Sequence, residues 1–109
     1  MELRGKVAIV TGGASGIGRG IAQRLAADGA RGIVVADVNL ERAEGVAREV
    51  GGLAVRCDVS VESDIQALVG AARQRFGQVD AYFSNAGILG RPGGIELEDP
   101  LWDKMWQIH

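Results

Sequence analysis

The sequence has few of the residues that cross-link a small protein or bind metal. Its 109 residues include one cysteine and one histidine. A single cysteine cannot form a disulfide within the chain, and one histidine beside it gives too few ligands for a cysteine–histidine metal cluster. We therefore expect no metal site. The thiol of Cys57 lies in an apolar run, which is typical of a core side chain in a reducing compartment such as the cytoplasm.

An excess of charge of one sign and long apolar runs are also missing. The 12 basic and 14 acidic residues give a formal net charge of −2, and the basic residues are scattered along the chain. Proteins that bind nucleic acid through its phosphates usually carry a basic patch. No apolar run approaches the about 20 residues that span a bilayer, and the first residues do not form a secretory signal. The sequence predicts a cytoplasmic protein whose partners include neither nucleic acid nor a membrane.

Proline is rare, with two residues, whereas glycine is abundant, with 17. The glycines separate short apolar runs from stretches with helical periodicity. Runs rich in β-branched or other apolar residues predict strands at residues 6–10, 33–36, 53–57 and 81–84. Helical patterns lie between these strands, and a further helix is expected to begin at Pro100. Strands that alternate with helices favour right-handed crossovers and a parallel sheet.

The expected helices carry apolar side chains at intervals of three and four residues. Ile17 and Leu25 belong to the inner face of the first helix, and Leu40 opens the inner face of the second. Asn39 is expected to cap the second helix and Ser60 the third, because their side-chain oxygens can accept hydrogen bonds from amides of the first turn.

Polar or glycine-rich segments follow all four predicted strands. In chain order they are residues 11–18, Asp37, Asp58-Val59 and Asn85-Ala86-Gly87. Ligands of open parallel sheets bind beyond the carboxyl ends of the strands. We therefore expect these four segments to line one crevice.

Residues 11–18, Thr-Gly-Gly-Ala-Ser-Gly-Ile-Gly, have the composition of a phosphate-binding turn. Gly12, Gly16 and Gly18 would let the chain turn sharply, bring backbone close to a pyrophosphate and pack the helix against the strand. The helix that follows would offer amide groups and the positive end of its dipole to the anion. Ser15 and Ile17 complete the predicted cofactor-binding residues of this turn.

The phosphate loop of nucleoside triphosphatases is an alternative that the next residues disfavour. The spacing of Gly13 and Gly18 fits that loop, but Arg19-Gly20 stands where it requires lysine followed by serine or threonine. Without the lysine and the hydroxyl that holds magnesium, ATP hydrolysis is not expected.

Asp37 follows Gly18 by 19 residues, close to the spacing of about 20 at which an acid binds ribose hydroxyls in dinucleotide-binding domains. Its charge would repel a 2′-phosphate, and neither Ser15 nor Val38 is basic. The predicted cofactor is therefore NAD rather than NADP. The alternative is that Asp37 only caps a turn.

The sequence resembles the short-chain dehydrogenase/reductase family over essentially its whole length, and the glycine turn matches the family's Thr-Gly-x3-Gly-x-Gly loop. The resemblance implies a Rossmann-type α/β fold, here an incomplete doubly wound parallel sheet of about four strands with flanking helices. It also implies that Asp58 binds the adenine amino group, with the Val59 backbone beside it. Asn85-Ala86-Gly87 would flank the cofactor ribose, although Ser84 stands where the family often has asparagine.

The catalytic residues of that family have no counterpart among these 109 residues. The family uses a serine and a Tyr-x-x-x-Lys pair, whereas the only tyrosine here is Tyr82 and the only lysines are Lys6 and Lys104. We expect Tyr82 to be structural and the chain alone to be inactive. His109 stands where the resemblance places the family's active-site asparagine. It is either part of a modified proton relay or an ordinary histidine.

We therefore expect residues 1–109 to form the N-terminal portion of a single NAD(P)-binding domain, truncated before the catalytic region. In the full-length enzyme, a hydride would pass between the nicotinamide and a small-molecule carbonyl or secondary alcohol. A homo-oligomer is expected only of that full-length protein. The alternatives are a non-catalytic dinucleotide-binding module and an inactive fragment.

Overall fold

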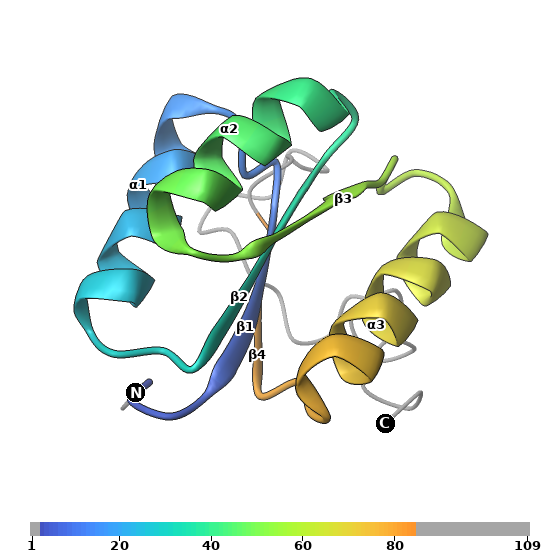
Figure 1. Cartoon of the computed structure of the whole chain (residues 1–109). Helices are drawn as coiled ribbons and strands as arrows, with labels where there is room; N and C mark the ends of the chain where they lie inside the picture. The colour runs from blue at the N-terminus through green and yellow to red at the C-terminus, as the bar shows by residue number, and fades with distance from the viewer. Residues whose placement is uncertain (1–2, 85–109) are drawn as a thin grey trace.

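The fold is that of a computed structural model, which describes residues 3–84. Strands and helices alternate along these residues, as the sequence predicts (Figure 1). In chain order the elements are β1 (Val7–Thr11), α1 (Gly16–Ala27), β2 (Gly32–Asp37), α2 (Leu40–Val50), β3 (Leu53–Arg56), α3 (Glu62–Phe76) and β4 (Ala81–Ser84). The predicted strand ends agree with these bounds to within one residue, and β4 matches its prediction.

The strands form one parallel sheet in the order β3-β2-β1-β4. Thr11 lies opposite Ala36 of β2 and Ser84 of β4. Asp37 lies opposite Arg56 of β3. The carboxyl ends of all four strands therefore meet at one edge, and the connections from β1, β2 and β3 to α1, α2 and α3 begin there.

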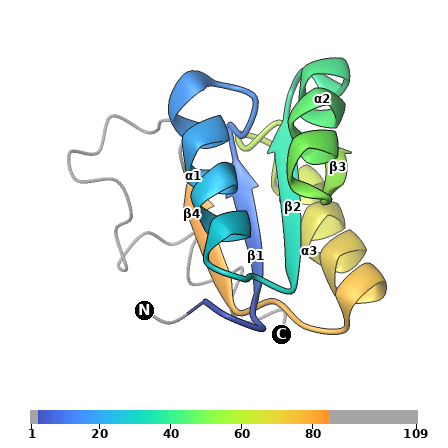
Figure 2. The same cartoon turned by 60° about the vertical axis from the view of Figure 1, so that its left-hand side comes forward.

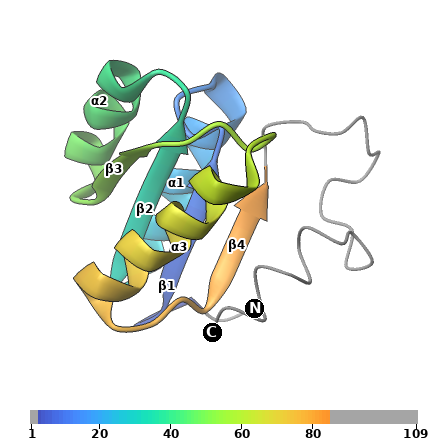
Figure 3. The same cartoon turned by 90° about the vertical axis from the view of Figure 1, so that its right-hand side faces the viewer.

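Helices cover both faces of the sheet. α1 and α2 lie on one face (Figure 2), where Leu25 and Val46 pack in one core cluster with Val35. α3 lies on the other face (Figure 3), where Leu68 packs in a second cluster with Val34. Neighbouring residues of a strand point to opposite faces, and burial of both faces explains the continuous apolar runs in the sequence. The architecture is an incomplete Rossmann-like α/β fold.

Asp80 ties together the amino ends of β1 and β4. Its carboxylate accepts a hydrogen bond of 2.8 Å from the amide of Val7, and its own amide donates to the Val7 carbonyl at 2.8 Å. Partial burial works to raise the pKa of this carboxyl. The hydrogen bonds from Val7 and the Gln78 side chain outweigh burial. The charges of Lys6 and Arg31 act in the same direction, so the pKa of Asp80 lies below its ordinary value.

Ile17 and Leu40, which were expected on inner helix faces, lie on the surface instead. Ile17 is 71% exposed and Leu40 is 40% exposed. Both belong to the first turn of a helix at the carboxyl edge of the sheet, and the first turn begins beyond the ends of the strands. On α2 the buried residues are Ala43, Val46 and Ala47.

The prediction of helix caps was right for α2 and wrong for α3. The Asn39 side chain accepts a hydrogen bond of 3.0 Å from the amide of Arg42, as a cap should. α3 begins at Glu62, and Val61 occupies its cap position without a side-chain hydrogen bond. Because the helix starts one residue later than expected, the Ser60 hydroxyl faces Asp58 and not the first-turn amides.

Candidate functional site

The predicted site residues within the described range all lie at the carboxyl edge of the sheet. The glycine turn follows β1, Asp37 ends β2, and Asp58-Val59 follows β3. The parallel register brings these exits side by side, as the view in Figure 3 shows for the upper end of the sheet. Asn85-Ala86-Gly87 and His109 lie outside the described residues.

The turn between β1 and α1 is held in shape by Gly12 and Ser15. Gly12 adopts a φ of 64°, in the left-handed region that side chains other than glycine rarely enter. The Ser15 hydroxyl donates to the Gly12 carbonyl at 2.8 Å and accepts from the Gly18 amide at 3.1 Å. Ser15 therefore caps α1 and closes the turn at the same time.

Two other glycines of the turn are required by close packing. A Cβ at Gly18 would collide with the backbone of Gly12 and Gly13, and a Cβ at Gly13 would lie 2.6 Å from Cγ1 of Val35. The requirement at Gly13 was not predicted, because glycine spacing does not show which strand residue lies beneath it. Gly16 differs from both, since nothing lies within 4 Å of the place its Cβ would occupy.

The amino end of α1 presents unpaired amide donors. Neither the Gly16 nor the Ile17 amide donates a hydrogen bond to any acceptor within residues 3–84. The first turn of α1 contains no acid, whereas the first turn of α2 contains Glu41 and that of α3 contains Glu62 and Asp64. Acids in a first turn offset the positive end of the helix dipole. Of these three helices, α1 alone has no acid in its first turn.

Asp37 links the glycine turn to the start of α2. Its Oδ2 accepts a hydrogen bond of 3.0 Å from the Ala14 amide, and its Oδ1 accepts one of 3.0 Å from the Asn39 amide. Asp37 is therefore a structural part of the turn. These two hydrogen bonds use two of the about four acceptor positions that an ionised carboxylate offers, so the Asp37 carboxylate keeps positions for a ligand.

Arg42 of α2 completes this connection from the other side. Its Nη2 donates to the Ala14 carbonyl at 3.2 Å, so Ala14 is bound through its amide by Asp37 and through its carbonyl by Arg42. The role of Arg42 was not predicted. The sequence places Arg42 in the first turn of the helix that Asn39 caps, close to the predicted site. It does not show where the long arginine side chain points from there.

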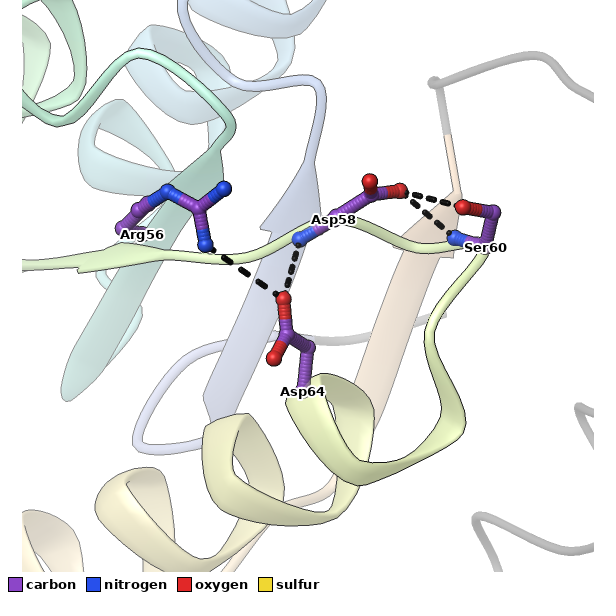
Figure 4. A network of polar contacts seen from close by, with 4 residues as sticks. All are labelled: Arg56, Asp58, Ser60 and Asp64. Carbon is purple, nitrogen blue, oxygen red and sulfur yellow. Dashed lines mark hydrogen bonds and ion pairs between the residues drawn. The ribbon is translucent and has the colours of Figure 1, made fainter.

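Asp58 sits in a polar network at the exit of β3 (Figure 4). Its Oδ1 accepts hydrogen bonds from the Ser60 hydroxyl at 2.6 Å and the Ser60 amide at 2.9 Å. These bonds stabilise the ionised form and hold the pKa of Asp58 below its ordinary value. The Asp58 amide donates to Oδ2 of Asp64 at 3.0 Å, and Nη1 of Arg56 lies 3.5 Å from the same oxygen.

The large apolar side chains that are exposed within the described residues gather at this same edge. They are Ile17 at the start of α1, Val38 and Leu40 around the β2–α2 connection, and Val61 before α3. Ile17 and Val38 are the most exposed, at 71% and 59%. Exposed apolar groups beside polar ones are typical of a surface that a ligand or partner covers.

Two side chains with reactive groups are buried elsewhere. Cys57 belongs to the core between the sheet and α3, and burial, followed by the negative charges of Asp64 and Asp58, raises the pKa of its thiol to about 11. Tyr82 of β4 lies in the same core, as expected of a structural residue. Within residues 3–84, no cluster of histidine, cysteine and acidic residues could hold a metal ion. No described helix is both long and apolar enough to cross a membrane.

The family follows from the sequence as a whole. The sequence model for short chain dehydrogenases matches residues 6–109. This chain belongs to the short chain dehydrogenase family. It is 40% identical over 111 residues to an uncharacterized oxidoreductase of Mycobacterium bovis, in an alignment that covers 98% of this chain and 44% of that protein.

Other members of the family show the same partial overlap. A 2,5-dichloro-2,5-cyclohexadiene-1,4-diol dehydrogenase of Sphingobium indicum is 47% identical over 89 residues, which are 80% of this chain and 35% of that enzyme. The crystal structure of a hydroxysteroid dehydrogenase from Escherichia coli superposes with a TM-score of 0.75 at 36% identity, covering 88% of this chain and 43% of that one. The chain therefore spans less than half the length of these short chain dehydrogenases.

Proposed function

We propose that this chain is the cofactor-binding part of an NAD-dependent short-chain oxidoreductase. In this proposal residues 1–109 form the N-terminal portion of a single NAD(P)-binding domain, and the carboxyl edge of the sheet is the dinucleotide site. When bound, NAD supplies the hydride chemistry of the enzyme. The residues of this chain bind and orient the cofactor.

The observation that carries the proposal is the open amino end of α1. The amides of Gly16 and Ile17 have no acceptor within residues 3–84, and no acid in the first turn offsets the helix dipole. The space at Gly16 would admit a pyrophosphate close to the backbone. An anion there would satisfy both amides, so the donor set fits a dinucleotide phosphate.

The neighbouring strand exits would bind the adenosine half. The acceptor positions that remain on Asp37 would take the hydroxyls of the adenosine ribose, and Asp58 with the Val59 backbone would hold the adenine. The apolar side chain of Val38, exposed beside Asp37, would cover part of the base. Asn85-Ala86-Gly87, which lie outside the described residues, would flank the ribose.

NAD is favoured over NADP because of the charge of Asp37. A 2′-phosphate would approach this carboxylate and be repelled by it. Arg42 is the basic residue of the same network, but its guanidinium already donates to the Ala14 carbonyl. The preference between the two cofactors is therefore a direct test of the role given to Asp37.

Titration of the 109-residue chain with NADH, followed by the fluorescence of the nucleotide, tests the proposal. We expect a saturable signal, weaker binding of NADPH, and displacement of NADH by ADP-ribose, which contains the adenosine half and both phosphates. A signal that rises linearly without saturation would show that this chain binds no dinucleotide, and that the inactive-fragment alternative is correct.

For the whole protein we propose hydride transfer between the nicotinamide and a carbonyl or secondary alcohol of a small molecule, in the cytoplasm and within a homo-oligomer. The 109 residues contain no Tyr-x-x-x-Lys pair, so this chain alone should bind the cofactor without oxidising an alcohol. Coding sequence downstream that contains serine followed by Tyr-x-x-x-Lys would support the oxidoreductase. Saturable binding without such a sequence would favour the non-catalytic binding module.

A further inference from the structure

The connection between β3 and α3 holds Asp58 by both its backbone and its side chain. The Asp58 amide donates to Oδ2 of Asp64, in the first turn of α3, and Ser60 donates both its amide and its hydroxyl to Oδ1 of Asp58. The other carboxylate oxygen of Asp58 accepts no hydrogen bond from residues 3–84 (Figure 4). One oxygen is thus held and the other is left open.

From this arrangement we propose that Asp64 and Ser60 are positioning residues, which hold Asp58 so that its open oxygen accepts the adenine amino group. The inference rests on the proposed function, in which Asp58 binds adenine. It adds two residues that do not touch the cofactor in the proposal but determine how well Asp58 recognises it.

The charges of the network favour this arrangement. Asp58 and Asp64 are both acids, and two carboxylates close together repel each other. Nη1 of Arg56 lies 3.5 Å from the same Oδ2 of Asp64 that accepts the Asp58 amide, and its positive charge offsets part of this repulsion. Its guanidinium also lowers the pKa of Asp58, after the larger effects of the Ser60 hydrogen bonds and of desolvation, which acts the opposite way. Asp58 therefore stays ionised and strongly accepting.

The hydrogen bonds show that the two positioning residues hold different parts of Asp58. Asp64 sets the direction of the backbone at Asp58, because it binds the amide six residues earlier. Ser60 sets the side-chain rotation, because both of its donors reach the same carboxylate oxygen. A group held in its binding conformation before the ligand arrives loses less entropy on binding.

A dinucleotide without the amino group separates this role from a general effect on folding. Nicotinamide hypoxanthine dinucleotide differs from NAD at one edge of the base, where a carbonyl replaces the adenine 6-amino group and the neighbouring N1 carries a proton. A carbonyl cannot donate to Asp58, so the wild-type chain should bind NAD about tenfold more tightly, the loss expected for one hydrogen bond to a charged group. The ratio of the two dissociation constants reports on how Asp58 and the adjoining Val59 backbone recognise this edge of the base, and its change in the variants of residues 60 and 64 reports on Asp58.

We expect Asp64→Ala to reduce this ratio to about twofold and Ser60→Ala to reduce it by a smaller factor, because the Ser60 amide still donates to Asp58. Asp64→Asn should restore most of the ratio, since its side-chain oxygen can still accept the Asp58 amide. Ser63→Ala is the matched control for Ser60, being an exposed serine at the same end of α3, and should leave the ratio unchanged. The melting temperature of each variant shows that it is folded.

The outcomes distinguish this inference from the function on which it rests. A wild-type chain that binds neither dinucleotide overturns both. A wild-type chain that prefers NAD, with the same preference in Asp64→Ala and Ser60→Ala, overturns the inference and leaves the proposed function standing. Equal weakening of both dinucleotides in Asp64→Ala also overturns it, because Asp64 would then support only the fold.

Discussion

The carboxylate of Asp37 accepts a hydrogen bond of 3.0 Å from the amide of Ala14, which lies 23 residues earlier in the chain. The acid proposed to select NAD is therefore also a support of the turn proposed to bind its phosphates. Cofactor choice and the shape of the turn depend on the same side chain, so a substitution at Asp37 changes both.

Asp37→Ala should weaken NAD by about tenfold or more, because hydrogen bonds to a charged acceptor are worth roughly 1.5–3 kcal/mol. NADP should lose less, since removal of the charge also removes the repulsion of its 2′-phosphate. Dissociation constants for both nucleotides, measured by calorimetry, test this expectation. An unchanged ratio of the two constants would mean that Asp37 supports the turn only and does not select the cofactor.

Arg42→Ala isolates the support of the turn from cofactor choice. Loss of the hydrogen bond to the Ala14 carbonyl should weaken NAD and NADP by the same factor, about threefold to tenfold. Arg48→Ala, at another exposed arginine of α2, is the control and should have no effect. If Arg42→Ala weakens NADP much more than NAD, the guanidinium binds the 2′-phosphate directly and our account of it is wrong.

Three glycine-to-alanine substitutions in α1 should have three different results. Gly18→Ala places a Cβ against the backbone of Gly12 and Gly13, which cannot move aside easily, and should cost roughly 1–3 kcal/mol of stability. Gly20→Ala meets nothing within 4 Å and should stabilise the helix by about 0.5–1 kcal/mol. Gly16→Ala also meets nothing, but its methyl would occupy the space proposed for the pyrophosphate.

The expected result for Gly16→Ala is thus a chain that is at least as stable as the wild type and binds NAD about tenfold more weakly, because a methyl group keeps the phosphate from the backbone. Thermal unfolding and NADH titration measure the two quantities separately. Wild-type affinity in Gly16→Ala would place the phosphate elsewhere.

The lowered pKa of Asp80 predicts how the stability of the fold depends on pH. The pKa of this carboxyl is lowered in the folded state, so its ionised form contributes stability above the ordinary pKa of about 4. That contribution is lost as the pH falls through the lowered value. Urea unfolding between pH 6 and pH 2.5 should show a smaller loss of stability on acidification in Asp80→Asn than in the wild type. Equal slopes would mean that the hydrogen bond from Val7 does not distinguish the charged form.

Much of the fold could be predicted from local patterns. The apolar runs of β1 and β2 and the turn residues between elements were enough for the four strands, because a parallel sheet covered on both faces imposes a simple pattern on its strands. The patterns failed at the first turns of helices. Ile17 and Leu40 have the right spacing for a core face, but they lie beyond the strands that would bury them.

The location of the candidate site could be predicted from the sequence, but the hydrogen bonds between its side chains could not. That Asp37 and Asp58 lie at one edge follows from their positions at strand ends. The contacts of Arg42 with Ala14 and of Asp64 with Asp58 do not, because they join elements through side chains with many possible rotamers. Ser60 is a further example. Because α3 begins one residue later than predicted, the Ser60 side chain does not cap the helix and donates a hydrogen bond to Asp58 instead.

The most direct test of the account is an NMR titration of the 15N-labelled chain with NAD, in which each backbone amide is followed separately. We predict that the amides of Gly16 and Ile17 show the largest changes, because they would donate to the pyrophosphate. The amides of Asp37 and Asp58 should shift in step and saturate at the same nucleotide concentration. Saturable binding that leaves the Gly16 and Ile17 amides unchanged would contradict the central claim that the amino end of α1 is the phosphate site.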